Sequence, residues 1–170
     1  MIIARWYLSG TQLAAPLQNQ VTLGGLTIVA STRRPALISS VACIALAIYY
    51  EARSQNLQGQ VAVANTIMNR VASENFPNTP CDVVKQGHYW AGHPVRNACH
   101  FSFWRDGKAE RIDDEEAYIK ALSIAVNAER LFDVTGGATY YHRDDVQPYW
   151  VSTVTPVRKI GRHIFYRSKK

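Results

Sequence analysis

The sequence predicts an α+β fold, mostly helical, with a small antiparallel sheet toward the C-terminus. Two periodic apolar segments follow one another between residues 39 and 72, and a third lies at about 114–131. Two short segments of alternating polarity follow, at 138–142 and 163–167. Of the 170 residues, 47% are hydrophobic and 19% charged, which is typical of a globular protein and not of a disordered one.

The N-terminal 36 residues are expected to form an arm or a small β element, and residues 37–170 the main domain. The first segment makes a poor signal peptide, because polar residues and a glycine at positions 9–12 interrupt its apolar part. The following "QVTLGGLTIVAS" reads as short β segments around Gly24-Gly25. No apolar stretch approaches the roughly 20 residues that a membrane span needs, so none is predicted.

Two helices are predicted before residue 73. Ser39 and Ser40 precede an almost wholly apolar segment, which predicts a capped, buried helix that ends near Ala52 or Arg53. Apolar residues then recur at spacings of three and four, which predicts an amphipathic helix over 57–72.

The second half of the chain is predicted to be irregular first and regular later. Residues 81–111 are rich in Gly, His and aromatic residues without periodicity, which predicts a long irregular segment. Asp113 and Glu116 are expected to form a capping box for a helix over about 114–131. Gly136-Gly137 ends that helix, and Gly161 marks a turn before the second alternating segment.

The three cysteines leave the disulfide pattern open. Cys43 lies in the apolar run and is expected to be a small buried hydrophobic residue. Cys81 and Cys99 are candidates for a bond, although an odd number of cysteines in a domain of this size does not require one.

The net charge of +6 is concentrated at the C-terminal end. From Tyr141 to Lys170 there are seven basic residues and two acidic ones. Such a region favours a polyanionic partner, namely nucleic acid, an anionic membrane surface or bacterial cell wall. The last three residues alone read as a solubility tail.

The sequence gives little support for a metal site or for a cysteine or serine nucleophile. His88, His93, Cys99 and His100 cluster, but without the spacing of HExxH or paired CxxC motifs, so polar loop histidines and no metal are expected. Cys81 or Cys99 with His142 would suit a thiol enzyme, but no local signature accompanies them, and no G-x-S-x-G elbow occurs.

A single carboxyl group is the strongest catalytic candidate. In "IYYEARSQ", Glu51 follows an apolar run and two tyrosines. Desolvation there raises the pKa of a carboxyl group, and an acid that is neutral near pH 7 can protonate a glycosidic oxygen, as the catalytic glutamate of lysozyme does. Aromatic residues that suit the walls of a sugar groove come from two regions: Trp90, Phe101, Phe103 and Trp104, then Tyr140, Tyr141, His142, Tyr149 and Trp150.

Four blocks resemble the SleB-type cell-wall hydrolases, the family of the spore-cortex-lytic enzymes. "IYYEARSQNLQGQVAVANTIMNR" (48–70) is similar to the opening Y-x-E-A-R … G-x-x-A-V-A … N-R signature, and "CHFSFWRDG" (99–107) to a C-x-F-S-F/W block. "GATYYH" with "PYW", and then "IGRHIFYR", are similar to the closing blocks. The blocks span roughly residues 40–167 in the family's order.

The resemblance implies a lysozyme-like domain that acts on peptidoglycan as a lytic transglycosylase, with Glu51 as general acid and then base and with no cofactor. It implies a 1,6-anhydro product from the bond between N-acetylmuramic acid and N-acetylglucosamine. It also implies peptidoglycan and not nucleic acid as the partner of a monomeric enzyme. The candidate substrate-binding residues are Gln55, Asn69, Ser102, Phe103, Trp104, Tyr141, His142, Tyr149 and Trp150, of which Tyr141 and His142 come first.

Two positions depart from the family pattern. Gln55 stands where many relatives carry a second Glu, which mildly favours transglycosylation over a hydrolysis that uses two carboxylates. Arg105 stands where relatives often have a Cys, so Cys99 is expected to be free or paired with Cys81.

Several alternatives remain open at this stage. They are a muramidase that adds water, an N-acetylmuramoyl-L-alanine amidase, and a non-enzymatic basic module that binds cell wall or nucleic acid. The absence of a spore-type signal and of a separate wall-binding module suggests a phage endolysin, made in the host cytoplasm and delivered to the wall at lysis. Otherwise the cell envelope is expected. The basic C-terminal region would then hold the enzyme on anionic wall polymers or lipopolysaccharide.

Overall fold

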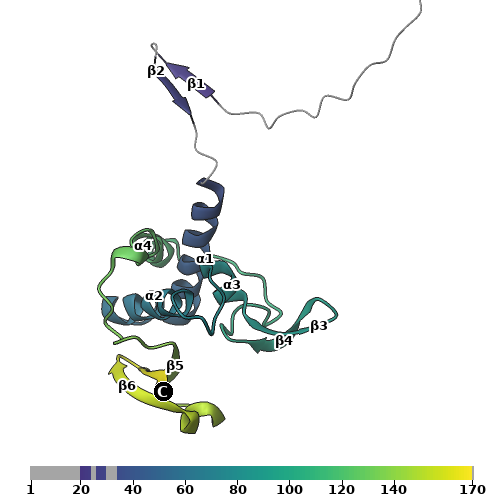
Figure 1. Ribbon diagram of the computed structural model, residues 1–170, viewed down its shortest axis with the longest axis vertical. Coiled ribbons are helices and arrows are strands. Elements are labelled where there is room, and N and C mark those ends of the chain that lie inside the picture. Colours follow the sequence, from purple (N-terminus) through teal and green to yellow (C-terminus); the bar gives the residue numbers. More distant parts are fainter. Residues whose placement is uncertain (1–19, 24–25, 30–33, 170) are drawn as a thin grey trace, which may run out of the picture. The chain divides into compact units, whose positions relative to one another are not determined.

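The computed structural model describes residues 20–23, 26–29 and 34–169, which fall into two compact units, 1–34 and 35–170 (Figure 1). In the first unit, β1 (Gln20–Leu23) and β2 (Leu26–Val29) pair as an antiparallel hairpin. The β segments predicted around Gly24-Gly25 are therefore confirmed.

Helix α1 (Arg34–Ala52) carries the centre of the core in the second unit. Its inward face includes Ile44, Ala45 and Ile48, all nearly or fully inaccessible to solvent. The helix starts before the predicted caps Ser39 and Ser40, so that boundary was wrong. Pro35 does not prevent the earlier start, because a proline in the first helical turn lacks an N–H that has no partner in the helix anyway.

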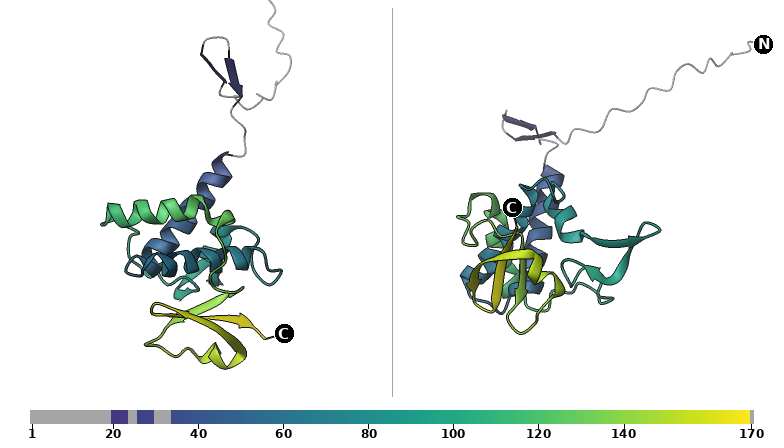
Figure 2. Two further views of the ribbon diagram at one scale, coloured as in Figure 1. Left: turned by 90° about the vertical axis from the view of Figure 1, so that its left-hand side faces the viewer. Right: turned by 60° about the horizontal axis from the view of Figure 1, so that its bottom comes forward.

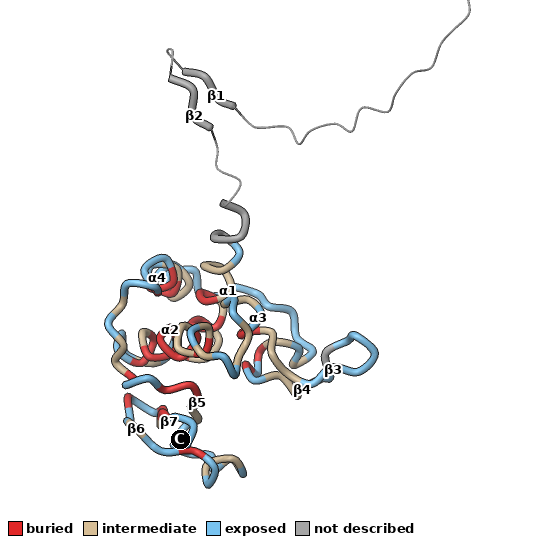
Figure 3. The backbone as a smooth tube through the Cα atoms, viewed as in Figure 1, coloured by how far each residue is buried: buried red, intermediate tan, exposed pale blue. Residues whose placement is uncertain are grey.

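Helix α2 (Leu57–Val71) is the amphipathic helix that the sequence predicts. Asn56 caps it by accepting a hydrogen bond from the Gly59 N–H at 2.9 Å. Its buried residues Ala64 and Ile67 join the core with α1, whereas Ala62 packs with the C-terminal sheet. Figure 3 shows most of α2 coloured as buried.

Residues 81–111 are more regular than predicted. Helix α3 (Pro80–Lys85) is capped by Thr79, and β3 (Gly87–Trp90) pairs antiparallel with β4 (His93–Cys99). The hairpin turns through Ala91 and Gly92, both at positive φ. It projects from the body of the unit (Figures 1 and 2), and β3 is mostly exposed. An exposed hairpin needs no apolar alternation, so its sequence gives no strand signal.

The third predicted helix is shorter than expected. Helix α4 runs from Glu115 to Val126, and a 3₁₀-helix, η1 (Ala128–Arg130), follows it. Asp114 and not Asp113 is the cap, accepting the Ala117 N–H at 2.9 Å. The predicted capping box is therefore wrong by one residue, and Glu116 pairs instead with Lys120 at 2.7 Å.

A three-stranded antiparallel sheet of order β5–β7–β6 closes the unit. It consists of β5 (Tyr140–Arg143), β6 (Val154–Ile160) and β7 (His163–Ser168), with a 3₁₀-helix, η2 (Tyr149–Thr153), before β6. The helices lie on one side of this sheet (Figures 1 and 2). The two alternating segments and the α+β class are thus confirmed. Strand β6 was missed because this edge strand contains Pro156 and a bulge.

The disulfide joins Cys43 to Cys81, with Cα atoms 5.2 Å apart. The suggested Cys81–Cys99 bond is therefore wrong, and Cys43 is not merely a buried apolar residue. Cys99 is a free cysteine. The bond links α1 to the first turn of α3, two elements that the packing of α2 brings together and that no local spacing could identify.

Within the described ranges, no helix is long and apolar enough to cross a membrane.

Candidate active site

Glu51 lies in the last turn of α1, two residues after the buried Tyr49. Its Oε1 accepts hydrogen bonds from the Ser102 backbone N–H at 3.1 Å and from the Ser102 hydroxyl at 3.3 Å. The buried Phe101 and Phe103 flank Ser102 and hold its backbone in place. The core therefore fixes both the acid and the group that orients it.

The surroundings of Glu51 favour its neutral form. Burial raises the pKa of Glu51 above its ordinary value, although hydrogen bonds from Ser102, from the Phe103 backbone and from the Tyr141 side chain oppose the rise. Desolvation is the larger effect. A carboxyl group with such a pKa keeps its proton at higher pH than a solvated one, and so suits general acid catalysis.

A pocket of about 190 Å³ opens beside this carboxyl group. Arg70 from α2, Ser102, Tyr141 from β5 and His163 from β7 contribute to its lining. Glu51 is the one carboxylic acid among the described residues that line it. The pocket thus joins an isolated acid to neutral and cationic groups.

Tyr141 faces this pocket from β5. Its ring packs against Phe165 and His163, with centroids 5.6 Å and 5.1 Å away. Burial, followed by the nearby Glu51, raises the pKa of Tyr141 well above its usual range. Tyr141 is therefore a neutral hydroxyl donor beside the acid.

His142 lines the same pocket but is held by the protein. Its Nδ1 lies 2.7 Å from the Arg143 carbonyl oxygen, and its Nε2 lies 2.8 Å from the Tyr166 hydroxyl. Its ring stacks on Tyr166 and contacts Trp150 at the edge. Of the two adjacent strand residues, Tyr141 is thus the one directed at Glu51.

Arg70 is a further residue of the Glu51 pocket, and it is held deep in the protein. Its side chain is 6% exposed, and its Nε donates to the Thr139 carbonyl oxygen at 2.7 Å. Its Nη1 is buried without a partner in the described part of the chain. Burial lowers the pKa of Arg70 from its usual value. A buried donor in the pocket of the acid is available to a substrate oxygen.

His163 is a residue that the sequence reasoning missed. It is 2% exposed, it lines the pocket, and its Nδ1 has no partner among the described residues. Burial lowers its pKa, which favours the neutral ring. Its only signal in the sequence was its place in the "IGRHIFYR" block.

The other aromatic candidates divide between core and surface. Phe103 is buried and stacks on Tyr50 with ring centroids 4.8 Å apart, and Trp104 packs against the core with Lys85 over its ring. Tyr149 is 94% exposed in η2, where Trp150 packs on the sheet. Trp90 is 80% exposed beside the tip of the β3–β4 hairpin and does not line the Glu51 pocket.

Gln55 and Asn69 do not line the Glu51 pocket either. The Gln55 side-chain oxygen accepts the Arg162 backbone N–H at 3.1 Å, which ties the α1–α2 junction to the β6–β7 turn. The Asn69 amide donates to Asp133 and Thr135 side chains and to the Ala138 carbonyl oxygen, at 3.1–3.2 Å. Both amides form bonds that hold loops of the protein in place.

The basic C-terminal region is partly neutralised. Arg143 pairs with Asp145, Lys159 pairs with Asp144 at 2.8 Å, and Arg162 lies near both acids. The two acids of this region thus pair with three of its basic residues. Exposed Arg158, Arg167 and Lys169 carry the remaining positive charge of this region in the part of the chain that the structure describes.

The described residues are not arranged as a metal site or as a thiol active site would require. The described residues contain no cluster of His, Cys, Asp and Glu side chains suited to a metal ion. Cys81 is oxidised in the disulfide, which removes it as a nucleophile. Burial raises the pKa of the Cys99 thiol, which disfavours the reactive thiolate.

Comparisons with known proteins agree with the arrangement. A family model described as Cell Wall Hydrolase matches residues 54–166 and so begins just after Glu51. A spore cortex-lytic enzyme of Bacillus cereus is 35% identical over 128 residues, 75% of this chain and 44% of that protein. One from Halalkalibacterium halodurans is 34% identical over the same share of this chain and 34% of that protein. The chain spans less than half the length of these curated relatives.

Two solved structures share the fold. The catalytic domain of the Bacillus cereus SleB protein has a TM-score of 0.58 and 32% identity, covering 76% of this chain and 91% of that one. The catalytic domain of the germination-specific lytic transglycosylase SleB from Bacillus anthracis has a TM-score of 0.59 and 31% identity, covering 81% of this chain and 97% of that one.

Proposed function

This chain is an enzyme of the cell wall hydrolase family, and from that premise we propose that it is a lytic transglycosylase. Its substrate is peptidoglycan, and the bond cleaved is the β-1,4 bond between N-acetylmuramic acid and N-acetylglucosamine. The name of the Bacillus anthracis relative supports the reaction type.

The single acid of the Glu51 pocket carries this proposal. Hydrolases with two carboxylates place the second one 5–10 Å or so from the first, as base or nucleophile. Among the described residues that line this pocket, Glu51 has no such companion. A reaction in which one residue acts first as acid and then as base fits this lining.

The reaction begins with the neutral form of Glu51. Ser102 donates two hydrogen bonds to Oε1 of the carboxyl group that carries the acid proton. That proton passes to the glycosidic oxygen as the C1–O bond of the muramic acid breaks, and positive charge develops at C1. The Glu51 carboxylate then takes the proton from the sugar's C6 hydroxyl, and O6 bonds to C1. The 1,6-anhydro ring forms, water is not consumed, and Glu51 is again protonated.

The neighbours of Glu51 support these steps. The Ser102 and Tyr141 donors stabilise the carboxylate that exists after the first proton transfer. The buried Arg70 Nη1 suits a hydroxyl or acetamido oxygen of the glycan. Exposed Tyr149 and the neighbouring Trp150 offer apolar faces to sugar rings farther along the strand.

Digestion of purified peptidoglycan by the wild type and by Glu51→Gln tests the proposal. We expect wild-type products that end in 1,6-anhydromuramic acid, and a loss of at least about 100-fold in rate in the variant. Glu129→Gln, an exposed change of the same chemistry in η1, is the matched control. Product masses separate the rivals, because a muramidase gives reducing muramic ends and an amidase releases peptides. A binding module would give no products, and Glu51→Gln would leave its action intact.

We also propose that the enzyme acts in the cell envelope. The Cys43–Cys81 disulfide supports this, because such bonds persist mainly in oxidising compartments. The phage-endolysin role is part of the same proposal, and its test is lysis of a host that expresses the chain together with a membrane-permeabilising partner. Electrostatic attachment through Arg167 and Lys169 predicts wall binding that weakens as salt rises.

A further inference from the structure

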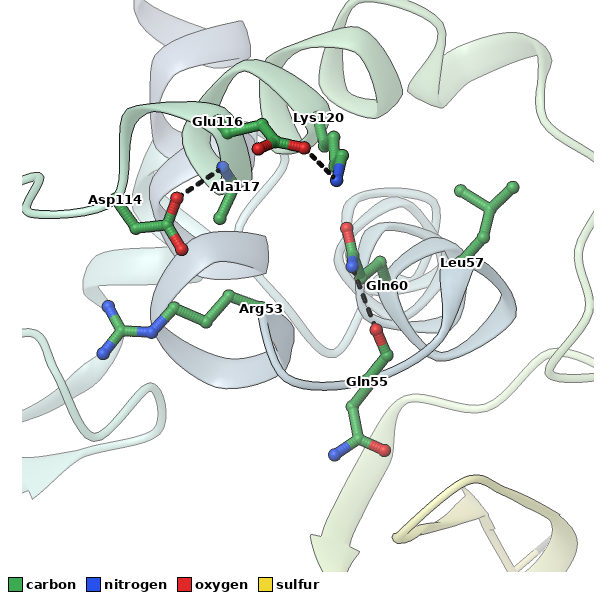
Figure 4. A pocket seen from close by; sticks show the side chains of 8 residues that line it. All are labelled: Arg53, Gln55, Leu57, Gln60, Asp114, Glu116, Ala117 and Lys120. Atoms are coloured by element: carbon green, nitrogen blue, oxygen red, sulfur yellow. Dashed lines mark hydrogen bonds and ion pairs between the residues drawn. The ribbon is translucent and has the colours of Figure 1, made fainter.

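The proposed substrate is a polymer, and the Glu51 pocket can hold only a small part of it. The pocket measures about 190 Å³, whereas pockets that bury a drug-sized molecule measure about 300–1,000 Å³. A pocket of about 610 Å³ lies at the junction of α1, α2 and α4 (Figure 4), but none of its residues lines the Glu51 pocket. Its Glu116 is paired with Lys120, and its Asp114 caps α4. Most of a glycan strand therefore lies on the surface around Glu51.

The base of the β3–β4 hairpin forms part of the wall of the Glu51 pocket. His100 follows β4 directly and lines the pocket. Its backbone N–H donates to the Gln86 carbonyl oxygen at 2.8 Å, and its Nδ1 lies 3.1 Å from the Gln86 side-chain oxygen. Two residues farther on, the Ser102 N–H donates to Glu51. The hairpin is therefore a continuous extension of the pocket wall.

Two side chains hold the hairpin to neighbouring segments of the protein. The Tyr89 hydroxyl on β3 donates to the Lys85 carbonyl oxygen at 2.9 Å. The Arg96 Nε on β4 donates to the Asp106 carbonyl oxygen at 3.2 Å. Each strand thus has its own attachment, and these hydrogen bonds fix the direction in which the hairpin projects (Figures 1 and 2).

The free face of the hairpin tip consists of Trp90 and His93. These residues are directly paired, and Trp90 points away from the face of Tyr89 because successive residues of a strand alternate in direction. Trp90 is 80% exposed, and His93 is exposed as well. The indole ring therefore buries little area on the protein, and a ligand that covers it is stabilised by burying that area.

The size and chemistry of the free face favour a sugar as its occupant. A Trp side chain offers at most about 250 Å² for burial, whereas a stable protein interface needs about 800 Å² on each partner. Attachment to a membrane surface needs a broad apolar face, which one ring beside a histidine does not supply. A sugar ring fits, because its C–H face stacks on an indole and its hydroxyls reach an imidazole nitrogen. No acidic residue lies between Gln86 and His100 to repel the carboxylates of peptidoglycan.

We propose that the free face binds the glycan strand at a distance from the cleaved bond, and this rests on the proposed function. From Cys99 at the base to His93 at the tip, β4 extends about 20 Å at about 3.4 Å per residue. A strand that is cleaved at Glu51 and stacks a sugar on Trp90 must therefore contain several sugars between these points. The hairpin thus favours long strands over short fragments.

The length of the substrate tests the assignment. Long glycan strands and a tetrasaccharide, both stripped of peptide stems, are digested by the wild type and by Trp90→Ala. We expect the ratio of kcat/KM for the long strands over the tetrasaccharide to fall about fivefold in the variant, because a stacked sugar is lost. Trp90→Phe keeps a flat ring and should recover most of the ratio. Phe132→Ala removes another exposed aromatic ring, outside the hairpin and the Glu51 pocket, and should keep the wild-type ratio.

An unchanged ratio in Trp90→Ala would overturn the assignment, provided that thermal unfolding shows the variant to be folded. If it is not folded, His93→Ala replaces it and should lower the ratio as well. A fall that occurs only with strands that keep their stems would place a peptide on Trp90 and refute the proposal. Loss of binding to phosphatidylglycerol vesicles with an unchanged ratio would refute it in favour of a membrane surface.

Binding separates this proposal from the proposed reaction. Glu51→Gln with Trp90→Ala should bind long strands about fivefold more weakly than Glu51→Gln alone, as measured by sedimentation. That result does not depend on which bond the wild type cleaves, or on whether it cleaves the tetrasaccharide. Equal affinities would overturn the role of the hairpin, whereas wild-type products without anhydro ends would overturn the reaction alone.

Discussion

Removing the Cys43–Cys81 bond should destabilise the fold by about 4 kcal/mol. The bond closes a loop with a sequence separation of 38 residues and joins the helix that carries Glu51 to α3. In the chain-entropy model a loop of this length restricts the unfolded state by about 13 cal/mol/K, or about 4 kcal/mol at 25 °C. For a domain of this size that corresponds to a fall in Tm of about 10 °C.

Urea unfolding of oxidised wild type and of Cys43→Ala/Cys81→Ala measures this loss. A reducing agent should destabilise the wild type by a similar amount and leave the double variant unchanged. Cys99→Ser is the control, and because Cys99 is free and only half-buried, we expect a loss below about 1 kcal/mol. A large loss in Cys99→Ser, or a loss under about 1 kcal/mol in the double variant, would contradict the pairing and the loop-entropy reasoning.

Three further predictions concern the hydrogen bonds around the site. The Ser102 hydroxyl donates a hydrogen bond that favours the ionised form of Glu51, so Ser102→Ala should raise the pKa of Glu51. The alkaline limb of the kcat/KM profile should therefore move to higher pH, and the rate should fall about fivefold. pH–rate profiles check this, and a move of the alkaline limb to lower pH would refute it. Asn69→Ala removes three hydrogen bonds and should lower the free energy of unfolding by about 2–3 kcal/mol, as measured by urea unfolding. Its KM should stay within about twofold of the wild-type value, as measured by steady-state kinetics. In Gln55→Glu, the new carboxylate should still accept the Arg162 N–H, so mass spectrometry should find anhydro products only; reducing ends would mean that this position selects the mechanism.

The position of Gln55 in the structure changes the interpretation of this residue. The missing second glutamate was first an indication of which reaction the enzyme runs. In the structure the Gln55 side-chain oxygen accepts the Arg162 N–H of the β6–β7 turn, and the Glu51 pocket does not include Gln55. The support for a one-acid mechanism therefore comes from the lining around Glu51 and not from residue 55.

Elements with a strong local pattern of apolar residues could be predicted from the amino-acid sequence. Helix α2 and strands β5 and β7 were predicted because one face of each packs on a core, and such packing leaves a period of 3.6 or 2 in consecutive residues. Helix α1 was predicted from its almost wholly apolar sequence. Glu51 was found for a related reason, since an acid that continues a buried apolar run must be desolvated. Local secondary structure and local desolvation both depend on residues that are neighbours in the sequence.

The contacts between groups that are distant in the sequence could be identified only in the folded protein. It assigned Ser102 to Glu51, Asn69 to the loop at 133–138, and Cys43 to Cys81, and it revealed His163 in the pocket. It also showed the β3–β4 hairpin, whose largely exposed residues carry no apolar period. These outcomes depend on how helices and sheet pack across 38 or more residues of chain, and no spacing within one segment encodes that packing.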